Sequence, residues 1–396
     1  MSNVSFAGLL RGALLCALAV VAWWPAASQA ASRSPAETEL LQVINDISRG
    51  DLDAASTRVA ALLKAHPQYR LAQLVQADLL MAQARPLAGF GNGDAPRNER
   101  LMQLRDELLL RVRAARETPG PGKVPAFFVS LPPDLKHALM VDTERSRLYV
   151  FRNNNGTPEL VADFYTTIGK AGADKLFEGD RRTPLGVYFV TGTRPKKSLT
   201  DFYGAGAFPL NYPNEWDKLM GRAGSGIWIH GVPSDTYARP PKDSDGCVVV
   251  SNPDLESISK FLQFGQTPVV IGRNLQWVPL ADWQRDRAPL VARFKGWASD
   301  WEKGGEGVIR HYSRLALVDG KRYADWLTRF SAKDNEEARG VDEASVTLIR
   351  DPAMPHLFVV SFEQAGRGKQ AGTKSRMRQY WLREGDDWRI IWQGQA

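Results

Sequence analysis

The spacing of hydrophobic side chains through the first third of the chain is that of amphipathic helices. Apolar residues recur every three or four positions, which places them on one face of a helix. The clearest run is Leu40, Leu41, Ile44 and Ile47. Breaks at Gly50 and Pro67 separate this run from later ones, and residues 100–116 show the pattern again. We therefore expect a helical segment over residues 31–118.

Within that segment, residues 50–85 resemble a tetratricopeptide-type helix pair. Ala55, Pro67 and Ala72 stand near the small and helix-breaking positions of such a unit. One unit cannot bury a solenoid core by itself. Two interpretations stay open: a module that binds a protein partner and, with more support, a helical pair packed on the main domain.

After residue 118 the pattern changes to short β-type runs separated by turns. Proline and glycine at 119–122 predict a linker, which we place at residues 119–134. Two β-rich runs around a polar turn then predict a hairpin over residues 137–152. The spacing predicts a mainly-β domain over residues 135–273, with further strands at 160–168, 186–191, 226–229 and 247–250.

The last part of the chain combines a long helical run, expected over residues 283–313, with short strands after it. Its stripe of large apolar side chains is Leu290, Phe294, Trp297 and Trp301. Such a stripe is more often core than pocket lining, so a pocket at Trp283, Trp297 and Trp301 is the weaker interpretation. The order of elements resembles the cone-shaped nuclear-transport-factor-like (SnoaL-like) domains over residues 280–396. The whole chain is thus predicted to be a multidomain α+β protein.

Composition is that of a soluble globular protein, with 43% hydrophobic and 24% charged residues. The net charge of +7 is a mild basic bias that suits an anionic surface such as a cell wall without requiring one. No dense basic run with interleaved aromatic residues indicates nucleic-acid binding. We therefore expect no nucleic-acid partner.

Residues 1–30 have the pattern of a secretory signal peptide. Arg11 precedes an apolar run at residues 13–24, and Ser28 and Ala30 supply small residues before a cleavage point. The run is too short for a typical membrane span. We expect export to the periplasm rather than an integral membrane protein, with an uncleaved N-terminal anchor as the alternative.

Removal of the signal peptide would change the number of cysteines in the exported protein. The chain has two cysteines, and Cys16 lies inside the signal. The exported protein would then hold one thiol, Cys247, which cannot form an internal disulfide. Such a cysteine is either an unpaired bystander or a reactive group.

The residues around Cys247 favour the reactive interpretation. His230 ends one β-type run, and Cys247 opens another directly after Gly246, whose missing side chain permits close approach of a substrate. A thiol needs a neighbouring base to become a good nucleophile near neutral pH. Histidine is the side chain that exchanges protons in that range. We therefore predict a Cys–His nucleophilic pair.

Two structural alternatives apply to the same residues. A cysteine beside three valines is often core, and a histidine after an apolar run is often a satisfied strand-end residue. A zinc site is disfavoured, because one Cys and one His fall short of four ligands. We expect neither a metal nor a cofactor.

The segment resembles the YkuD-type L,D-transpeptidase family. The family signature is His-Gly, a loop, and Ser/Thr-x-Gly-Cys before an apolar strand, matched here at residues 230–231 and 244–247. The resemblance covers roughly 138–272 and includes further blocks at residues 168–170, 179–186 and 210–214. It implies an enzyme of cell-wall biogenesis and cell shape, acting on peptidoglycan stem peptides through a cysteine thioester.

The resemblance also assigns roles to individual residues. Cys247 would be the nucleophile, and His230 would first generate the thiolate and then protonate the leaving amine. The carbonyl of Gly231 would orient the imidazole. The main-chain N–H groups of Gly246 and Cys247 would form the oxyanion hole, and Ser244 would support the loop.

Two positions depart from the family pattern. Asp245 stands where many members have His or Arg, and Val249 stands where many have Arg. The ending Cys-x-x-x-Ser-Asn at residues 247–252 resembles the divergent YafK-like branch, which includes an enzyme that hydrolyses peptidoglycan links. Asp245 would disfavour a nearby thiolate, unless it points outward or contacts a cationic group of the substrate.

The acceptor of the thioester therefore stays open. An L,D-transpeptidase that transfers to an amine, for cross-linking or protein attachment, is the leading prediction. An L,D-endopeptidase or amidase that uses water is the second, and a non-catalytic wall-binding protein is an alternative of another class. The helical or C-terminal domain could add a protein partner.

Overall fold

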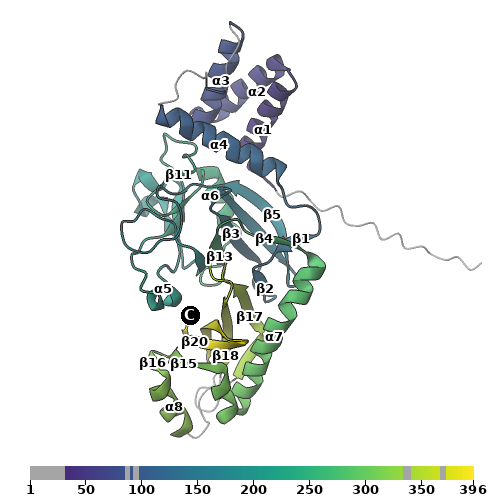
Figure 1. Ribbon diagram of the computed structural model, residues 1–396. Helices are drawn as coiled ribbons and strands as arrows, with labels where there is room; N and C mark the ends of the chain where they lie inside the picture. The colour runs from purple at the N-terminus through teal and green to yellow at the C-terminus, as the bar shows by residue number, and fades with distance from the viewer. Residues whose placement is uncertain (1–31, 85–89, 92–97, 333–339, 366–371) are drawn as a thin grey trace, which may run out of the picture. The chain divides into compact units, whose positions relative to one another are not determined.

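The computed structural model describes residues 32–396 except for 85–89, 92–97, 333–339 and 366–371 (Figure 1). The predicted signal peptide, residues 1–30, lies outside the described residues. None of the helices in the described ranges is long and apolar enough to span a membrane.

The N-terminal segment is helical, as predicted. Its helices in the described part of the chain are α1 (Pro35–Ser48), α2 (Leu52–Ala65), α3 (Arg70–Ala82) and α4 (Glu99–Arg116). Ser34 and Asp51 cap α1 and α2 by accepting a hydrogen bond from a first-turn N–H. Gly50 joins α1 to α2 at a φ of 80°, in the left-handed region that glycine adopts without strain.

These helices pack on the β domain that follows. Their shared core includes Leu40, Val59 and Leu71, and Tyr237 enters it from the β domain. A buried ion pair of 2.7 Å joins Glu37 of α1 to Arg147. The segment is therefore a helical layer on the main domain, the second of the two interpretations above.

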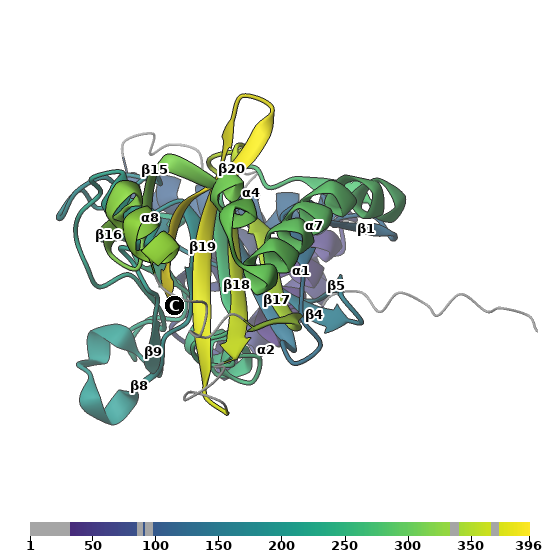
Figure 2. The same cartoon turned by 90° about the horizontal axis from the view of Figure 1, so that it is seen from below.

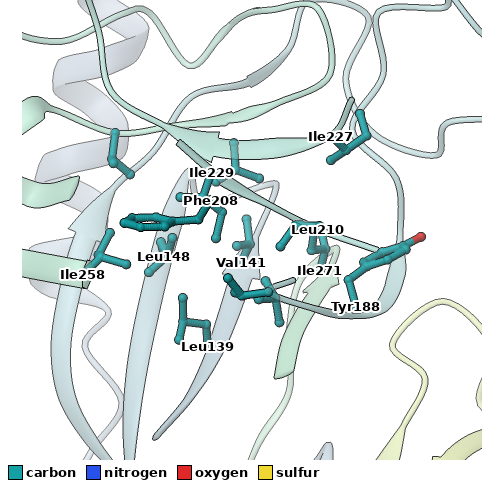
Figure 3. Packing of buried hydrophobic residues seen from close by; sticks show 14 of the residues in the cluster. Leu139, Val141, Leu148, Tyr188, Phe208, Leu210, Ile227, Ile229, Ile258 and Ile271 are labelled. Carbon is teal, nitrogen blue, oxygen red and sulfur yellow. The ribbon is translucent and has the colours of Figure 1, made fainter. Parts of the chain in front are cut away.

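The β domain has two larger sheets around one core. One has the order β5 (Thr157–Tyr165), β4 (Arg147–Asn154), β3 (His137–Asp142), β13 (Pro268–Gly272) and β7 (Gly186–Phe189). The other has the order β12 (Val248–Val249), β10 (Trp228–His230), β9 (Gly206–Pro209) and β8 (Arg194–Pro195). Side chains such as Leu139, Leu148, Phe208 and Ile229 meet between them (Figure 3).

Shorter elements complete this domain. They are β6 (Ile168–Gly169), which pairs with β11 (Lys242–Ser244), the helices α5 (Glu215–Leu219) and α6 (Asn252–Ser259), and the 3-10 turns Lys196–Ser198 and Asp201–Tyr203. The predicted hairpin is confirmed, because β3 and β4 pair antiparallel from His137↔Arg152 to Asp142↔Arg147.

The C-terminal part begins with the long helix α7 (Leu280–Lys303) and a 3-10 turn (Glu306–His311). Its sheet has the order β16 (Lys321–Arg322), β15 (Tyr312–Val318), β20 (Asp387–Gln395), β19 (Lys374–Glu384), β18 (Leu357–Ala365), β17 (Gly340–Arg350) and β2 (Phe128–Ser130). Helix α8 (Tyr323–Ala332) follows β16. Figure 2 shows α7 lying across β17 and β18.

The tryptophan stripe of α7 belongs to the core, as expected. Trp297 is fully buried and Trp301 nearly so, and the cluster around them includes Phe358 and Trp381 of the sheet. Trp283 is also nearly buried, but it lines a pocket together with Phe127 and Arg350, so the core interpretation holds for Trp297 and Trp301.

The stretch predicted to be a linker is structured instead. Within residues 119–134, β1 (Lys123–Pro125) pairs with β14 (Trp277–Pro279), and β2 pairs with β17 of the C-terminal sheet. Val124, Phe128 and Leu131 are buried. The breaker signal ended at Gly122, and the apolar residues after it pair with strands far along the chain, which local composition does not reveal.

The predicted fold class is confirmed in its main features. The described chain mixes helices and strands, with a helical segment before a mainly-β domain. Phe128 and Leu131 share a cluster with Ile349 and Trp392, so the β domain and the C-terminal sheet share buried apolar contacts.

Candidate active site

Two neighbouring parallel strands carry the predicted nucleophile and base. β10 ends at His230, and β12 begins directly after Cys247. The pairing Ile229↔Val248 and His230↔Val249 sets Cys247 beside the start of β10. Apolar alternation buries Ile229 and Val248 in the core, which fixes the register of both strands.

The imidazole of His230 is buried and held by its own neighbour. Its Nδ1 lies 2.7 Å from the carbonyl oxygen of Gly231. A carbonyl only accepts, so we assign the hydrogen to Nδ1 and leave Nε2 as the free base. Burial lowers the pKa of His230 to about 4, and the nearby charge of Arg239 adds to that effect. The imidazole is therefore neutral at pH 7.

The thiol of Cys247 is also neutral at rest. Its sulfur donates to the carbonyl oxygen of Gly226 at 3.3 Å, rather than to the imidazole. Burial raises the pKa of Cys247 and Asp245 adds to the rise, whereas the N–H of Trp228 and the charge of Arg239 oppose it. The structure therefore holds no preformed thiolate, and a nucleophilic attack by this thiol would need a base to take its proton.

The side chain of Ser244 is bonded to the Gly246 N–H, one of the two main-chain groups expected to bind an oxyanion. Its hydroxyl accepts a hydrogen bond from the Gly246 N–H at 3.1 Å and donates to the Cys247 carbonyl at 2.6 Å. The Gly246 N–H is thus already bonded within the turn, and its use in an oxyanion hole stays a prediction. These two hydrogen bonds of the Ser244 hydroxyl support the loop before Cys247.

Thr183 braces the same turn from another part of the chain. Its hydroxyl donates to the Gly246 carbonyl at 3.0 Å and accepts from the Gly169 N–H at 2.9 Å. Gly246 has a φ of 125°, and a Cβ there would lie 2.7 Å from the carbonyl oxygen of Arg182. Only glycine fits at this position, so the turn before Cys247 is fixed.

Asp245 lies at the rim rather than in the site. Its side chain is 68% exposed and lies 3.7 Å from the ammonium group of Lys170. Of the two arrangements expected for Asp245, the structure shows the outward one. Its charge still reaches the thiol and raises the pKa of Cys247, after the larger effect of burial.

Asn252 is a residue that sequence reasoning missed. Its Oδ1 accepts from the N–H groups of Ala205 and Val232, and its Nδ2 donates to the Val232 carbonyl at 2.9 Å. A Cβ on Gly231 would overlap this oxygen, so Gly231 must be glycine. The one sequence signal was the Ser-Asn pair at the start of α6, which a helix cap also explains.

Sequence reasoning also missed the two aromatic rings and the arginine that lie beside His230. The ring of Tyr203 lies 5.1 Å from the His230 ring, and the ring of Phe202 lies 5.8 Å from it. The Cζ atom of Arg239 lies 4.6 Å from the centre of the Phe202 ring. These loop residues have no periodic pattern that could have predicted their meeting.

A metal centre finds no ligand set in the described ranges, where no group of three or more His, Cys, Asp and Glu side chains is placed to hold an ion.

Comparison with known proteins identifies the domain that carries this site. Residues 136–271 match the family model of the L,D-transpeptidase catalytic domain, YkuD. This part of the chain is therefore similar to the catalytic domain of that family, and the chain extends beyond the match on both sides. No curated protein sequence matches the chain significantly.

Two solved structures share most of the architecture. Bd1075 of Bdellovibrio bacteriovorus is 23% identical, with a TM-score of 0.59 over 69% of this chain and 99% of that chain. The helical cell shape determining protein Pgp2 of Campylobacter jejuni is 19% identical, with a TM-score of 0.56 over 68% of this chain and 95% of that chain. At these identities the likeness shows the fold alone.

A third structure resembles only the C-terminal part. An NTF2-like protein from Pseudomonas putida covers 27% of this chain at 15% identity, with a TM-score of 0.22. That score carries no argument, so the SnoaL-like assignment stays a prediction.

Proposed function

We propose that this protein is a cysteine acyltransferase that acts on the L,D-amide bond of peptidoglycan stem peptides. The observation that carries the proposal is that Cys247 directly precedes β12 and His230 ends the adjacent strand β10, inside a segment that matches the L,D-transpeptidase family model. Export through residues 1–30 would deliver the enzyme to its substrate in the periplasm.

In the acylation step, Nε2 of His230 takes the thiol proton of Cys247 as the sulfur attacks the carbonyl carbon of the third stem residue. The carbonyl electron pair moves onto oxygen, and the Cys247 N–H is the remaining candidate to stabilise it. When the intermediate collapses, the imidazolium returns its proton to the leaving amine of the fourth residue. The product is a thioester on Cys247.

In the second step, an acceptor attacks the thioester and His230 takes the acceptor's proton. We propose that the acceptor is an amine of a second stem peptide, which restores an amide bond and the free thiol. A protein amine at the same position would give protein attachment.

Hydrolysis is the second candidate, and one observation favours it. Asp245 was the acidic group available to attract an amine acceptor, but Lys170 already lies 3.7 Å from it. If no other group attracts the amine, water resolves the thioester.

A role in cell shape follows from the same proposal. Pgp2, which shares the fold over 68% of this chain, is described as a helical cell shape determining protein. An enzyme that changes stem peptides alters the cross-links that maintain shape. A partner of the helical or C-terminal domain would direct it.

Mass spectrometry tests the proposal. Residues 31–396 are incubated with a disaccharide-tetrapeptide, and Cys247→Ala serves as the control. Cross-linked dimer supports transfer, whereas released D-alanine without dimer supports hydrolysis, and the control must give neither. If the intact protein gives no product and its thiol forms no adduct with a carbapenem, the proposal is wrong.

A further inference from the structure

The cations around the thiol differ in whether they already have a partner. Lys175 acts on Cys247 from a buried position, but its ammonium group lies 2.9 Å from Asp180 and donates to the Phe177 carbonyl. Lys170 faces Asp245 at 3.7 Å. These two lysines are therefore engaged within the chain.

Arg239 is the exception near the site. Its charge acts on both His230 and Cys247. Its guanidinium lies over the Phe202 ring, 4.6 Å from the ring centre. Among the residues that the structure describes, Arg239 makes no ion pair. A guanidinium in this position has its donors available to an incoming anion.

The main chain at Arg239 is held from several directions. Its carbonyl accepts a hydrogen bond from Tyr165 and another from Thr167, each at 3.0 Å. Two prolines follow, which restrict the backbone, and the carbonyl of Pro241 accepts from the Ile168 N–H at 2.9 Å. The loop therefore presents Arg239 from a fixed base.

The helical layer anchors the same loop two residues earlier. Tyr237 is buried in the core of the helices, with its ring 4.3 Å from the Tyr69 ring and 4.8 Å from the His66 ring. This contact gives the N-terminal helices a part in the site, because they fix the loop that connects His230 to Ser244.

We propose that Arg239 determines specificity by binding the terminal carboxylate of the leaving fourth residue of the stem peptide. A guanidinium binds a carboxylate through two parallel hydrogen bonds. That carboxylate is separated from the leaving amine by a single carbon atom, and His230 protonates the amine in the proposed reaction. Phe202 lies against both the His230 ring and the Arg239 guanidinium, so Arg239 is held close to the imidazole that would protonate the leaving amine.

The proposal rests on the proposed function and predicts a preference for chain length. A tetrapeptide stem presents a free carboxylate next to the bond that breaks. A pentapeptide stem, or a tetrapeptide with an amidated end, presents a neutral amide there. Arg239 therefore selects tetrapeptide ends.

Kinetics with paired substrates test this preference. The substrates are a tetrapeptide stem, the same stem with its terminal carboxylate amidated, and the same stem with the side carboxylate of the third residue amidated. We expect Arg239→Gln to lower kcat/KM on the first substrate by roughly tenfold or more. Terminal amidation should cost the intact enzyme a similar factor and cost Arg239→Gln nothing further. Arg152→Gln, which removes an exposed arginine of β4, is the matched control.

Two results would overturn the proposal. One is an equal loss on all three substrates, which would make Arg239 a positioning residue only. The other is a loss that vanishes on the third substrate instead of the second. Binding measured by calorimetry in a Cys247→Ser background separates this test from the reaction itself. A Kd preference for the free terminal carboxylate that Arg239→Gln removes supports the proposal even if the intact protein shows no turnover.

Discussion

Two buried polar regions of this molecule are built on opposite rules. Where the helices meet the β domain, two buried arginines each pair with two carboxylates. Arg147 is fully buried between Glu37 and Asp163, and Arg111 contacts both Glu37 and Glu107. Burial alone would raise the pKa of Glu37, but Arg147 and Arg111 outweigh burial and lower it. Burial raises the pKa of Glu107 instead, but both arginines have their charged partners, and we call this cluster saturated.

The candidate active site, with His230 buried and Cys247 partly exposed, is left unsaturated. His230 and Cys247 are both neutral at rest, since burial lowers the pKa of the first and raises that of the second. Nε2 of His230 is a free base by its tautomer, and Arg239 makes no ion pair with any described residue.

This difference in hydrogen bonding and ion pairing distinguishes a region that stabilises the fold from one that can bind a substrate. Paired buried charges hold elements in place and gain little from any further ligand, because their hydrogen bonds are already made. Neutral groups held by main-chain bonds keep their capacity for a proton or a substrate. The following changes test that contrast.

The largest effect is expected from removal of the base. His230→Gln should lower the rate at which a carbapenem acylates Cys247 by roughly 10²- to 10⁴-fold, the range for a general base. The rate is measured by mass spectrometry of the adduct. His137→Gln, at the start of β3 in the same domain, is the matched control. A loss within a factor of about three of that control would contradict the role of His230.

The saturated cluster should respond in stability instead. Arg147→Met leaves Glu37 and Asp163 without their shared partner, which for a buried ion pair costs about 3–5 kcal/mol of the free energy of unfolding. Arg152→Met breaks an exposed pair on the same strand and should cost about 1 kcal/mol or less. Urea denaturation measures both. Equal losses for the two variants would show that the buried cluster contributes no more than a surface pair.

The spacing of apolar and polar residues predicted those parts of the fold and site that depend on residues close together in the sequence. The β3–β4 hairpin followed from alternation around a turn, and the strands that carry His230 and Cys247 followed from short apolar runs. The core role of Trp297 followed from helical periodicity. In each case the residues that decide the structure are close together in the sequence.

The parts that were missed depend on distant pairing. Strand β2 joins the C-terminal sheet through β17, more than two hundred residues later. Asn252 and Arg239 reach the site from a helix start and an irregular loop. The Gly246 N–H is taken by a hydroxyl two residues away, and only the geometry of the turn shows that it bends back.

A smaller effect is expected at this turn. Ser244→Ala leaves the Gly246 N–H and the Cys247 carbonyl without their partner, at a cost of about 1–3 kcal/mol. The freed Gly246 N–H could also bind an oxyanion. The variant therefore compares the use of this N–H in the turn with its use in an oxyanion hole. Carbapenem acylation should slow if the turn matters more and quicken if the donor matters more. Ser257→Ala, which removes an exposed serine of α6, is the control. No change in stability or rate would show that Ser244 does not brace the turn.

The smallest effect is expected at the rim, where Asp245→Asn changes one charge and little else. Asp245 disfavours the thiolate, so its removal should lower the pKa of Cys247 and shift the pH profile of alkylation by iodoacetamide to lower pH. The shift should stay below about one unit, because the carboxylate is exposed and faces Lys170. Asp243→Asn, two residues earlier, should leave the profile unchanged. In residues 31–396 Cys247 is the only cysteine, so the rate reports this thiol directly. A shift to higher pH would contradict the assignment, since it would mean that Asp245 stabilises the thiolate through the residues around it. A shift to lower pH would show that the pKa of Cys247, in the unsaturated site, responds to the loss of one exposed charge.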